Sequence, residues 1–394
     1  MREGARQHDD VVLGAAVQRT VVDSTDTDDF DAVKAVLLVG GEGTRLRPLT
    51  WSAPKPLLPI ANQPLVERQL DWLRAHGVTE VVLSLGYLPD NFRRQFPDDC
   101  YRGVQLRYAV ESQPLNTAGA LRFALPDADE TFVVCNGDVL TTLDLSALVQ
   151  FHRERRADAT IHLAEVDDPS AFGVAPTDAD GRVLAFVEKP PPGEAPSRWI
   201  NAGTYVLEPR VLEGIPRDMP VSIERETFPQ LLEDGRGAVY GFQSRAYWLD
   251  VGTPASYLAA HAAVLAGRLG TPPVAGARQL RPSVWVQGSP VVADQALVVG
   301  AALIGDGARV EAGAVVEDSV LGARCVVEKG ARVTRSVLLD GAQLQAHAQA
   351  LDAVVGPEAV LDSYAVVSEQ TIVGARAVVA AGSTAAGVRI AVVP

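Results

Sequence analysis

The first half of the fold is decided by Lys34-Ala-Val-Leu-Leu-Val-Gly-Gly-Glu-Gly-Thr-Arg-Leu-Arg-Pro-Leu-Thr50. The stretch begins with an apolar run, which is typical of a strand buried on both faces of a parallel sheet. Gly40, Gly41 and Gly43 follow directly. Glycines let the backbone approach a ligand closely and direct N–H groups at phosphate oxygens. The stretch therefore predicts a buried strand that leads into a phosphate-binding loop.

Two cationic side chains, Arg45 and Lys55, lie close to this glycine loop in the sequence. A guanidinium group can hold phosphate through two parallel hydrogen bonds, whereas an ammonium group acts as a mobile point charge. The loop is not a P-loop, because no Gly-Lys-Ser/Thr follows, and Leu46 stands where a dinucleotide fingerprint has its third glycine. A glycine loop alone is often only a tight turn, but its combination with Thr44, Arg45 and Pro54-Lys-Pro56 favours phosphate binding.

Apolar strands alternate with amphipathic helices as far as residue 270. We expect strands at 80–85, 105–110, 131–135 and 159–166, and helices at 65–76, 117–125 and 146–156. This alternation predicts an α/β domain at residues 33–270, with a Rossmann-like, mixed and mostly parallel sheet flanked by helices. Ligands of such sheets bind beyond the carboxyl ends of the strands, so the residues after each strand are the candidates for function.

Beyond a proline-containing linker at 271–273, apolar residues recur at every sixth position. The phases are Val286, Val292, Val298, Ile304, Val310 and Val316; then Val315, Leu321, Val327, Val333 and Leu339; then Val354, Val360, Val366, Ile372 and Val378. A six-residue repeat places one short strand on each side of a triangular prism, with every sixth residue pointing inward. The period predicts a left-handed parallel β-helix at residues 280–394. A β-sandwich would not keep this period over so many turns.

Composition narrows the class of function. The 394 residues are 47% hydrophobic and carry 49 acidic against 35 basic side chains, a formal net charge of −14. Such a charge disfavours nucleic acid and anionic membranes as partners, and residues 1–32 are predicted to be an acidic N-terminal extension. Three widely spaced cysteines give no disulfide framework, and we find neither a signal peptide nor an apolar stretch of membrane-spanning length. We therefore expect a cytoplasmic protein.

Six blocks of sequence resemble the sugar-1-phosphate nucleotidyltransferases, also called NDP-sugar pyrophosphorylases. They are Gly40–Thr50, Asn136-Gly-Asp138, Phe186-Val-Glu-Lys-Pro190, Asn201-Ala-Gly203, Ser222-Ile-Glu-Arg-Glu-Thr-Phe-Pro229 and Trp248-Leu-Asp-Val-Gly-Thr-Pro254. The resemblance runs from about residue 36 to residue 258, and several branches of the family carry an appended β-helix. It is greatest to the mannose-1-phosphate guanylyltransferase branch. It identifies residues 33–270 as a nucleotidyltransferase catalytic domain.

The positions of two aspartates favour a metal site. Asp138 follows the predicted strand at 131–135, and Asp250 follows a strand-like stretch at 246–249. Two carboxylates from distant parts of a chain can hold Mg²⁺ on a triphosphate. Taken alone, Asp138 could be a turn residue and Asp250 a helix cap near Thr253. The resemblance implies that the pair binds Mg²⁺.

The resemblance also assigns the remaining roles. It implies catalysis by Arg45, Lys55, Asp138 and Lys189, and sugar-phosphate binding by Gly137, Glu188, Lys189 and Asn201. It implies nucleotide binding by Leu38, Gly40, Gly41, Gly43, Thr44, Arg45, Glu111, Pro114, Asn116 and Thr117.

Glu111 bears on the choice of base. The pyrimidine-specific branches of the family have Gln at the matching position. A carboxylate only accepts hydrogen bonds, and guanine offers N1–H and its amino group as adjacent donors, so Glu111 favours GTP. Glu111 could instead be a surface side chain after a strand. Asn116 departs from the glycine of the guanylyltransferase pattern, although Asn tolerates a left-handed backbone.

The leading hypothesis is transfer of a guanylyl group from GTP to mannose 1-phosphate, which yields a GDP-sugar and pyrophosphate. Uridylyl or thymidylyl transfer to glucose 1-phosphate, and guanylyl transfer to a cyclitol phosphate, are the alternatives. A regulatory relative without turnover would have lost the Arg, Lys and Asp set, which is intact here. His347 is isolated within the repeats and gives little support to acyl transfer. The β-helix is expected to mediate homo-oligomerisation, since its faces are rich in small apolar residues.

Overall fold

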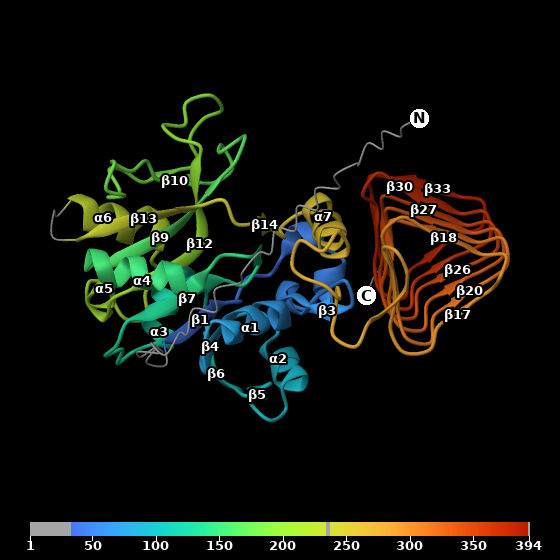
Figure 1. Cartoon of the computed structure of the whole chain (residues 1–394), viewed down its shortest axis with the longest axis horizontal. Coiled ribbons are helices and arrows are strands. Elements are labelled where there is room, and N and C mark those ends of the chain that lie inside the picture. Colours follow the sequence, from blue (N-terminus) through green and yellow to red (C-terminus); the bar gives the residue numbers. More distant parts are fainter. Residues whose placement is uncertain (1–32, 234–236, 393–394) are drawn as a thin grey trace, which may run out of the picture. The chain divides into compact units, whose positions relative to one another are not determined.

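The computed structural model describes residues 33–233 and 237–392, so the predicted extension at residues 1–32 lies outside the described residues. Its first part is built on a mixed sheet with the strand order β11-β10-β12-β7-β1-β4-β6-β5, to which β9 and β13 are added through β12 (Figure 1). The central strands β7 (Phe132–Asn136), β1 (Lys34–Leu38), β4 (Glu80–Leu85) and β6 (Val104–Val110) run parallel.

Most of the flanking strands run antiparallel to their neighbours. They are β5 (Cys100–Tyr101), β9 (Ala159–Glu165), β10 (Gly173–Val174), β11 (Val187–Glu188) and β12 (Trp199–Leu207), whereas β13 (Val239–Ser244) pairs with β9 in parallel. In the central register, Leu38 faces Ser84 of β4 and Asn136 of β7. The carboxyl ends of three parallel strands therefore meet at one edge of the sheet, as expected for a ligand site.

Helices cover both faces of this sheet because the strand residues alternate between two apolar clusters. The helices are α1 (Leu65–Ala75), α2 (Pro89–Gln95), α3 (Asn116–Ala124), α4 (Leu145–Arg155), α5 (Pro209–Glu213), α6 (Phe228–Glu233) and α7 (Pro254–Leu265), with a π-helix η4 (Ile223–Thr227) before α6. Leu37 packs with α1, α2 and α4 on one face, whereas Val36 packs with α3, α5 and α6 on the other. This confirms the predicted α/β fold class.

Short elements complete the edge that carries the glycine loop. They are the 3₁₀ helices η1 (Thr44–Leu46), η2 (Leu49–Trp51) and η3 (Lys55–Leu57), the hairpin β2 (Pro59–Ile60) and β3 (Gln63–Pro64), and the pair β8 (Val139–Thr141) and β14 (Trp248–Asp250). Thr253 caps α7 in a capping box with Ser256, which ends the β14 segment at a defined place.

The second part is a parallel β-helix with three sheets, as predicted (Figure 1). The first sheet has β15 (Arg278–Arg281), β16 (Val284–Val286), β19 (Ala302–Ile304), β22 (Val320–Leu321), β25 (Val337–Leu338), β28 (Val354–Val355), β31 (Ile372–Val373) and β34 (Arg389–Ile390). The second has β17 (Val291–Val292), β20 (Arg309–Val310), β23 (Val326–Val327), β26 (Gln343–Leu344), β29 (Val360–Leu361) and β32 (Val378–Val379). The third has β18 (Leu297–Val299), β21 (Val315–Glu317), β24 (Arg332–Thr334), β27 (Gln349–Leu351), β30 (Val366–Ser368) and β33 (Thr384–Ala386).

For part of the β-helix, the residues predicted to point inward are wrong by one position. The interior is lined by Val355, Leu361, Val367, Val373 and Val379 rather than by Val354, Val360, Val366, Ile372 and Val378. Val315 and Leu339 of the second phase also lie outside the interior cluster, whereas the first phase points inward as predicted. The reason is that these strands carry two consecutive apolar residues, so that the six-residue period alone cannot tell which of the two faces the core.

The outer residues of the first sheet are apolar because they pack on the α/β domain. Leu303, Val320, Val337, Val354 and Ile372, here called the docking ladder, are register neighbours on successive coils. They are buried in one cluster with residues of the α/β domain that include Leu46 and Leu49 of η1 and η2. Asn62, in the turn between β2 and β3, also donates hydrogen bonds to Gln287 Oε1 and to the Leu321 carbonyl.

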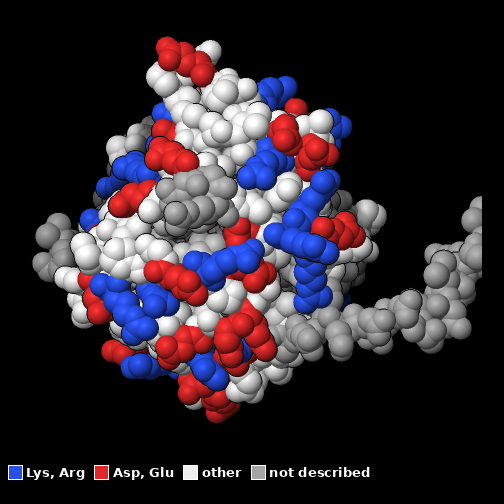
Figure 2. All heavy atoms as spheres, turned by 90° about the vertical axis from the view of Figure 1, so that its left-hand side faces the viewer, with Lys and Arg blue, Asp and Glu red and all other residues white. Residues whose placement is uncertain are grey.

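The surface and the helices bear on possible partners. Figure 2 shows acidic and basic side chains interspersed over the face that lies to the left in Figure 1. Among the residues that the structure describes, no helix combines the length and the apolar character needed to cross a membrane.

Candidate active site

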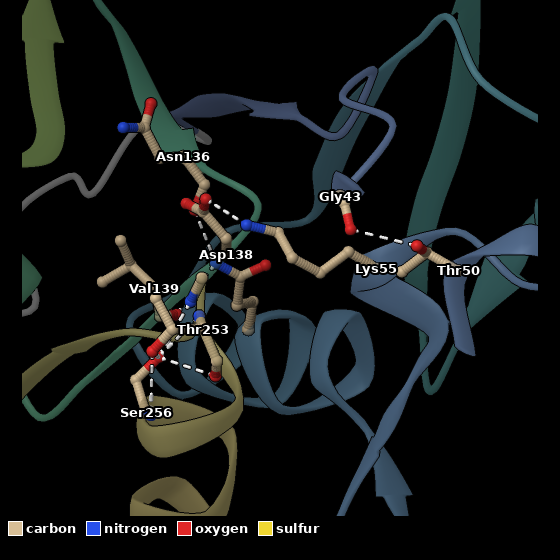
Figure 3. A network of polar contacts seen from close by, with 10 residues as sticks. Gly43, Thr50, Lys55, Asn136, Asp138, Val139, Thr253 and Ser256 are labelled. Carbon is tan, nitrogen blue, oxygen red and sulfur yellow. Dashed lines mark hydrogen bonds and ion pairs between the residues drawn. The ribbon is translucent and has the colours of Figure 1, made fainter. Parts of the chain in front are cut away.

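The glycine loop after β1 has a conformation that needs glycine at position 43. Gly43 has φ of 61°, and a Cβ atom there would lie 2.9 Å from Lys55 Cβ and 3.1 Å from Thr50 Cγ2. The Thr50 hydroxyl donates to the Gly43 carbonyl at 3.0 Å (Figure 3). The loop is thus folded closely over η2 and η3, which brings Lys55 beside it.

Two hollows open at this edge of the sheet and share Leu38, Gly41 and Asp138. The larger, of about 480 Å³, is also lined by Gly40, Ser84, Tyr87, Glu111, Pro114, Asn116, Thr117 and Asn136. The smaller, of about 220 Å³, is also lined by Gly43, Thr44, Arg45, Lys55, Pro56 and Gly137. Each of the residues predicted to bind nucleotide therefore lines one hollow or the other.

Two other hollows of similar size lie away from the glycine loop. One, of about 490 Å³, is lined by Lys34 and Arg107 among others, and the second, of about 430 Å³, by Trp72 and the linker prolines. The hollows beside the glycine loop are the better candidates for an active site, because they lie at the carboxyl ends of the parallel strands and contain paired charges.

Two cations and one carboxylate line the smaller hollow, namely Arg45, Lys55 and Asp138, and a second carboxylate, Asp250, lies beside them. Strands β14 and β8 pair so that Asp250 faces Val139, and the Val251 amide donates to the Asp138 carbonyl at 2.8 Å. Lys55 Nζ lies 2.5 Å from Asp138 Oδ2 (Figure 3). A Cβ atom at Gly252 would lie 2.5 Å from Arg45 Nη2 and 2.8 Å from Asp250 Oδ1, so glycine leaves room for these two groups.

Asp250 lies in an environment that opposes its negative charge. Burial raises the pKa of the Asp250 carboxyl, and the neighbouring Asp138 raises it further, while Lys55 and Arg45 act in the opposite direction. Its Oδ1 atom is buried without a hydrogen-bond partner. A buried carboxylate oxygen that lacks a partner, beside a second carboxylate, suits a hard divalent cation. In the described residues no group of three or more His, Cys, Asp or Glu side chains could hold a metal, so this chain would supply two carboxylates.

Glu111 lines the larger hollow and is fixed there by two hydrogen bonds. Its Oε1 accepts a hydrogen bond from Ser84 Oγ at 3.0 Å and its Oε2 accepts one from the Leu115 amide at 2.9 Å. The carboxylate thereby joins the end of β4 to the start of α3. Asn116 begins α3 with φ of 56°, in the left-handed region that Asn tolerates, so the turn persists without the glycine of the family pattern.

A second layer behind α3 was not predicted. Thr117 Oγ1 donates to Glu224 Oε2 at 2.8 Å and accepts from the Ile223 amide at 2.8 Å. A Cβ atom at Gly119 would lie 2.3 Å from the Met219 carbonyl oxygen. Residues 219–224 therefore support the turn that carries Asn116 and Thr117. The sequence block that begins at Ser222 indicated that this segment is functionally important. It did not indicate that the segment contacts Thr117.

The predicted sugar-phosphate residues Glu188, Lys189 and Asn201 do not line either hollow. Lys189, at φ of 52°, is exposed, and its Nζ lies 3.7 Å from Glu188 Oε1. Asn201 Nδ2 donates to the Tyr205 hydroxyl at 2.8 Å, and Asn201 Oδ1 accepts from the Gly203 amide. Burial raises the pKa of Tyr205 well above its usual value, with Glu224 adding to the effect, so this hydroxyl stays neutral.

Comparison with known proteins agrees with the geometry. A model of the nucleotidyl transferase family matches residues 34–267, and one described as the GMPPB C-terminal domain matches residues 298–393. The mannose-1-phosphate guanylyltransferase of Mycobacterium tuberculosis is 42% identical over 304 residues, covering 75% of this chain and 83% of that protein. A UTP–glucose-1-phosphate uridylyltransferase of Synechocystis is 35% identical over 322 residues, covering 77% and 82%.

Among solved structures, HddC from Yersinia pseudotuberculosis, complexed with GMP-PN, is 32% identical with a TM-score of 0.51 and covers 58% of this chain and 98% of its own. The family model spans more than half of the chain, and the Mycobacterium relative is matched over most of its length. The chain belongs to the nucleotidyl transferase family.

Proposed function

We propose that this protein transfers a guanylyl group from GTP to a sugar 1-phosphate, with mannose 1-phosphate as the favoured acceptor. The observation that carries the proposal is the group of four charges formed by Arg45, Lys55, Asp138 and Asp250 at the smaller hollow. A phosphate oxygen of the acceptor attacks the α-phosphorus of GTP, the bond from that phosphorus to the bridging oxygen breaks, and pyrophosphate leaves.

The two hollows can divide the nucleotide between them. The larger has the volume and the mixed polar and apolar lining that a base and ribose need, and Glu111 lies at its wall. The smaller combines the glycine loop with Arg45 and Lys55, which can bind the oxygens of a triphosphate. The acceptor oxygen is already ionised at neutral pH and needs no general base. The chain's contribution is therefore positioning and neutralisation of charge.

Asp138 and Asp250 would hold Mg²⁺, and their oxygen donors and the unpartnered Asp250 Oδ1 fit that ion. When bound, Mg²⁺ would neutralise charge on the phosphates. Lys189 and Glu188 are proposed to contact the acceptor, which requires their segment to approach the hollows when the acceptor binds.

The base preference rests on Glu111. A carboxylate has about four lone-pair sites, and two of them are used by Ser84 and Leu115, so acceptor capacity remains for guanine N1–H and the amino group. The relatives named as mannose-1-phosphate guanylyltransferases, and the HddC complex with GMP-PN, support GTP. Uridylyl transfer to glucose 1-phosphate is the second candidate, because the Synechocystis relative carries that name.

The experiment is a matrix of four nucleoside triphosphates against mannose 1-phosphate and glucose 1-phosphate, with pyrophosphate release as the readout. We expect the highest kcat/KM with GTP and mannose 1-phosphate. Glu111→Gln removes the acceptor-only carboxylate while keeping the size of the side chain. It should therefore lower the ratio of kcat/KM for GTP to kcat/KM for UTP. Higher kcat/KM for UTP and glucose 1-phosphate in the parent protein would favour the second candidate.

A further inference from the structure

Lys55 and Asp138 form a close ion pair at the place where two different ligands are expected. The distance from Lys55 Nζ to Asp138 Oδ2 is 2.5 Å, and the side chains are 12% and 29% exposed (Figure 3). Arg45 lies beside Asp250 across Gly252. The two cations and two carboxylates of this site thus neutralise each other within the protein.

In the proposed function, Lys55 and Asp138 each bind a ligand that their mutual ion pair blocks. Asp138 is expected to offer its oxygens to a divalent cation, and Lys55 is expected to bind phosphate. While the ammonium group occupies Asp138 Oδ2, that oxygen is poorly available to a metal ion, and while it is paired, Lys55 is poorly available to phosphate. Separating the pair without new partners is unfavourable, because each charge would then be left partly buried and uncompensated.

The position of the Lys55 stem makes an exchange of partners feasible. Lys55 begins η3, and its Cβ lies beside Gly43, which belongs to the glycine loop. The ammonium group is carried on a flexible four-carbon chain. Rotation of that chain can move Nζ between Asp138 and the smaller hollow, which both residues line, without displacement of the backbone.

We propose that the Lys55 ammonium group pairs with Asp138 in place of the divalent cation until that cation and the triphosphate bind together. The inference builds on the proposed function of the same site. The metal replaces the ammonium group on Asp138, and the phosphates receive the ammonium group that the metal displaces. Metal alone binds weakly because it leaves Lys55 without a partner, and the triphosphate removes that penalty. The affinities for metal and nucleotide are therefore coupled, and the coupling is reciprocal.

The test measures metal binding without nucleotide and without turnover. Mn²⁺ is titrated into the full-length protein and free Mn²⁺ is followed by electron paramagnetic resonance. Lys55→Met keeps the length of the stem and removes the charge, so it should bind Mn²⁺ more tightly than the parent, by on the order of tenfold. The same variant should bind GTP more weakly in the presence of Mn²⁺. Lys329→Met in the β-helix makes the same change in net charge far from Asp138 and should leave Mn²⁺ binding unchanged.

The exchange of partners predicts that Lys55→Met raises the affinity for Mn²⁺ and lowers the affinity for GTP. Mn²⁺ binding by Lys55→Met that is unchanged, weaker than in the parent or undetectable would overturn the inference. Lys55→Gln provides the same comparison if the Met variant does not fold. Because no turnover is involved, a parent protein that binds Mn²⁺ and GTP but releases no pyrophosphate would contradict the proposed function alone.

Discussion

The contact between the docking ladder and the glycine-loop region can be tested by one hydroxyl group. Val354 is fully buried on the outer face of β28, between its register neighbours Val337 and Ile372. Val354→Thr keeps the β-branched shape and the strand propensity but places a hydroxyl group in an apolar cluster. A buried hydroxyl without a partner costs about 1–3 kcal/mol. The cost should appear as weaker docking of the β-helix on η1 and η2, since Leu46 and Leu49 share that cluster.

Hydrogen exchange read by mass spectrometry on the peptide that covers residues 44–51 is the assay. A cost of about 1–3 kcal/mol, if it appears in local opening, accelerates exchange by about 5- to 150-fold. Val360→Thr is the matched control, because Val360 points outward from β29 and is only partly buried, so its new hydroxyl can reach water. Equal exchange in the two variants would mean that the docking ladder does not support the loop that carries Arg45.

Three further predictions concern the metal pair, a buried histidine and assembly. Asp138→Asn should lower turnover by about 10²–10³-fold, and near-normal activity across a magnesium titration would contradict the site. His261 accepts from the Ala61 amide through Nδ1, and burial lowers its pKa to about 3. Protonation therefore favours the unfolded chain, and the unfolding midpoint should fall as pH decreases from about 6.5 towards 3, less steeply in His261→Gln. The partly exposed outer valines of β17 and β32 fit assembly through the β-helix, so light scattering should detect an oligomer, and a monomer would count against it.

The sequence predicted those parts of the fold that depend on local pattern. The apolar run at 34–39 followed by glycines specified a buried strand and its loop, and strand ends placed Asp138 and Asp250 at a common edge, where β8 and β14 pair. The six-residue period specified the β-helix because it matches neither a helix nor an ordinary strand.

What the sequence did not reveal depends on contacts between distant segments. The consecutive apolar residues Val354-Val355 and Ile372-Val373 are alike in hydrophobicity, and only docking on the other domain decides that the first of each pair faces outward. Glu224, which accepts from Thr117, and Gly252, which leaves room for Arg45 beside Asp250, serve residues far away in the chain. Both residues lie in recognised sequence blocks, at 222–229 and 248–254, but the blocks do not show which distant residues they contact.

The four charges at the smaller hollow are proposed to serve guanylyl transfer to a sugar 1-phosphate. The most direct measurement is pyrophosphate release by the full-length protein with Mg²⁺, GTP and mannose 1-phosphate, accompanied by identification of the nucleotide product by mass spectrometry. We expect equal amounts of pyrophosphate and GDP-mannose, with no pyrophosphate when mannose 1-phosphate is omitted. Pyrophosphate release that does not require a sugar 1-phosphate, or none with any pairing of nucleotide and sugar phosphate, would contradict this proposal.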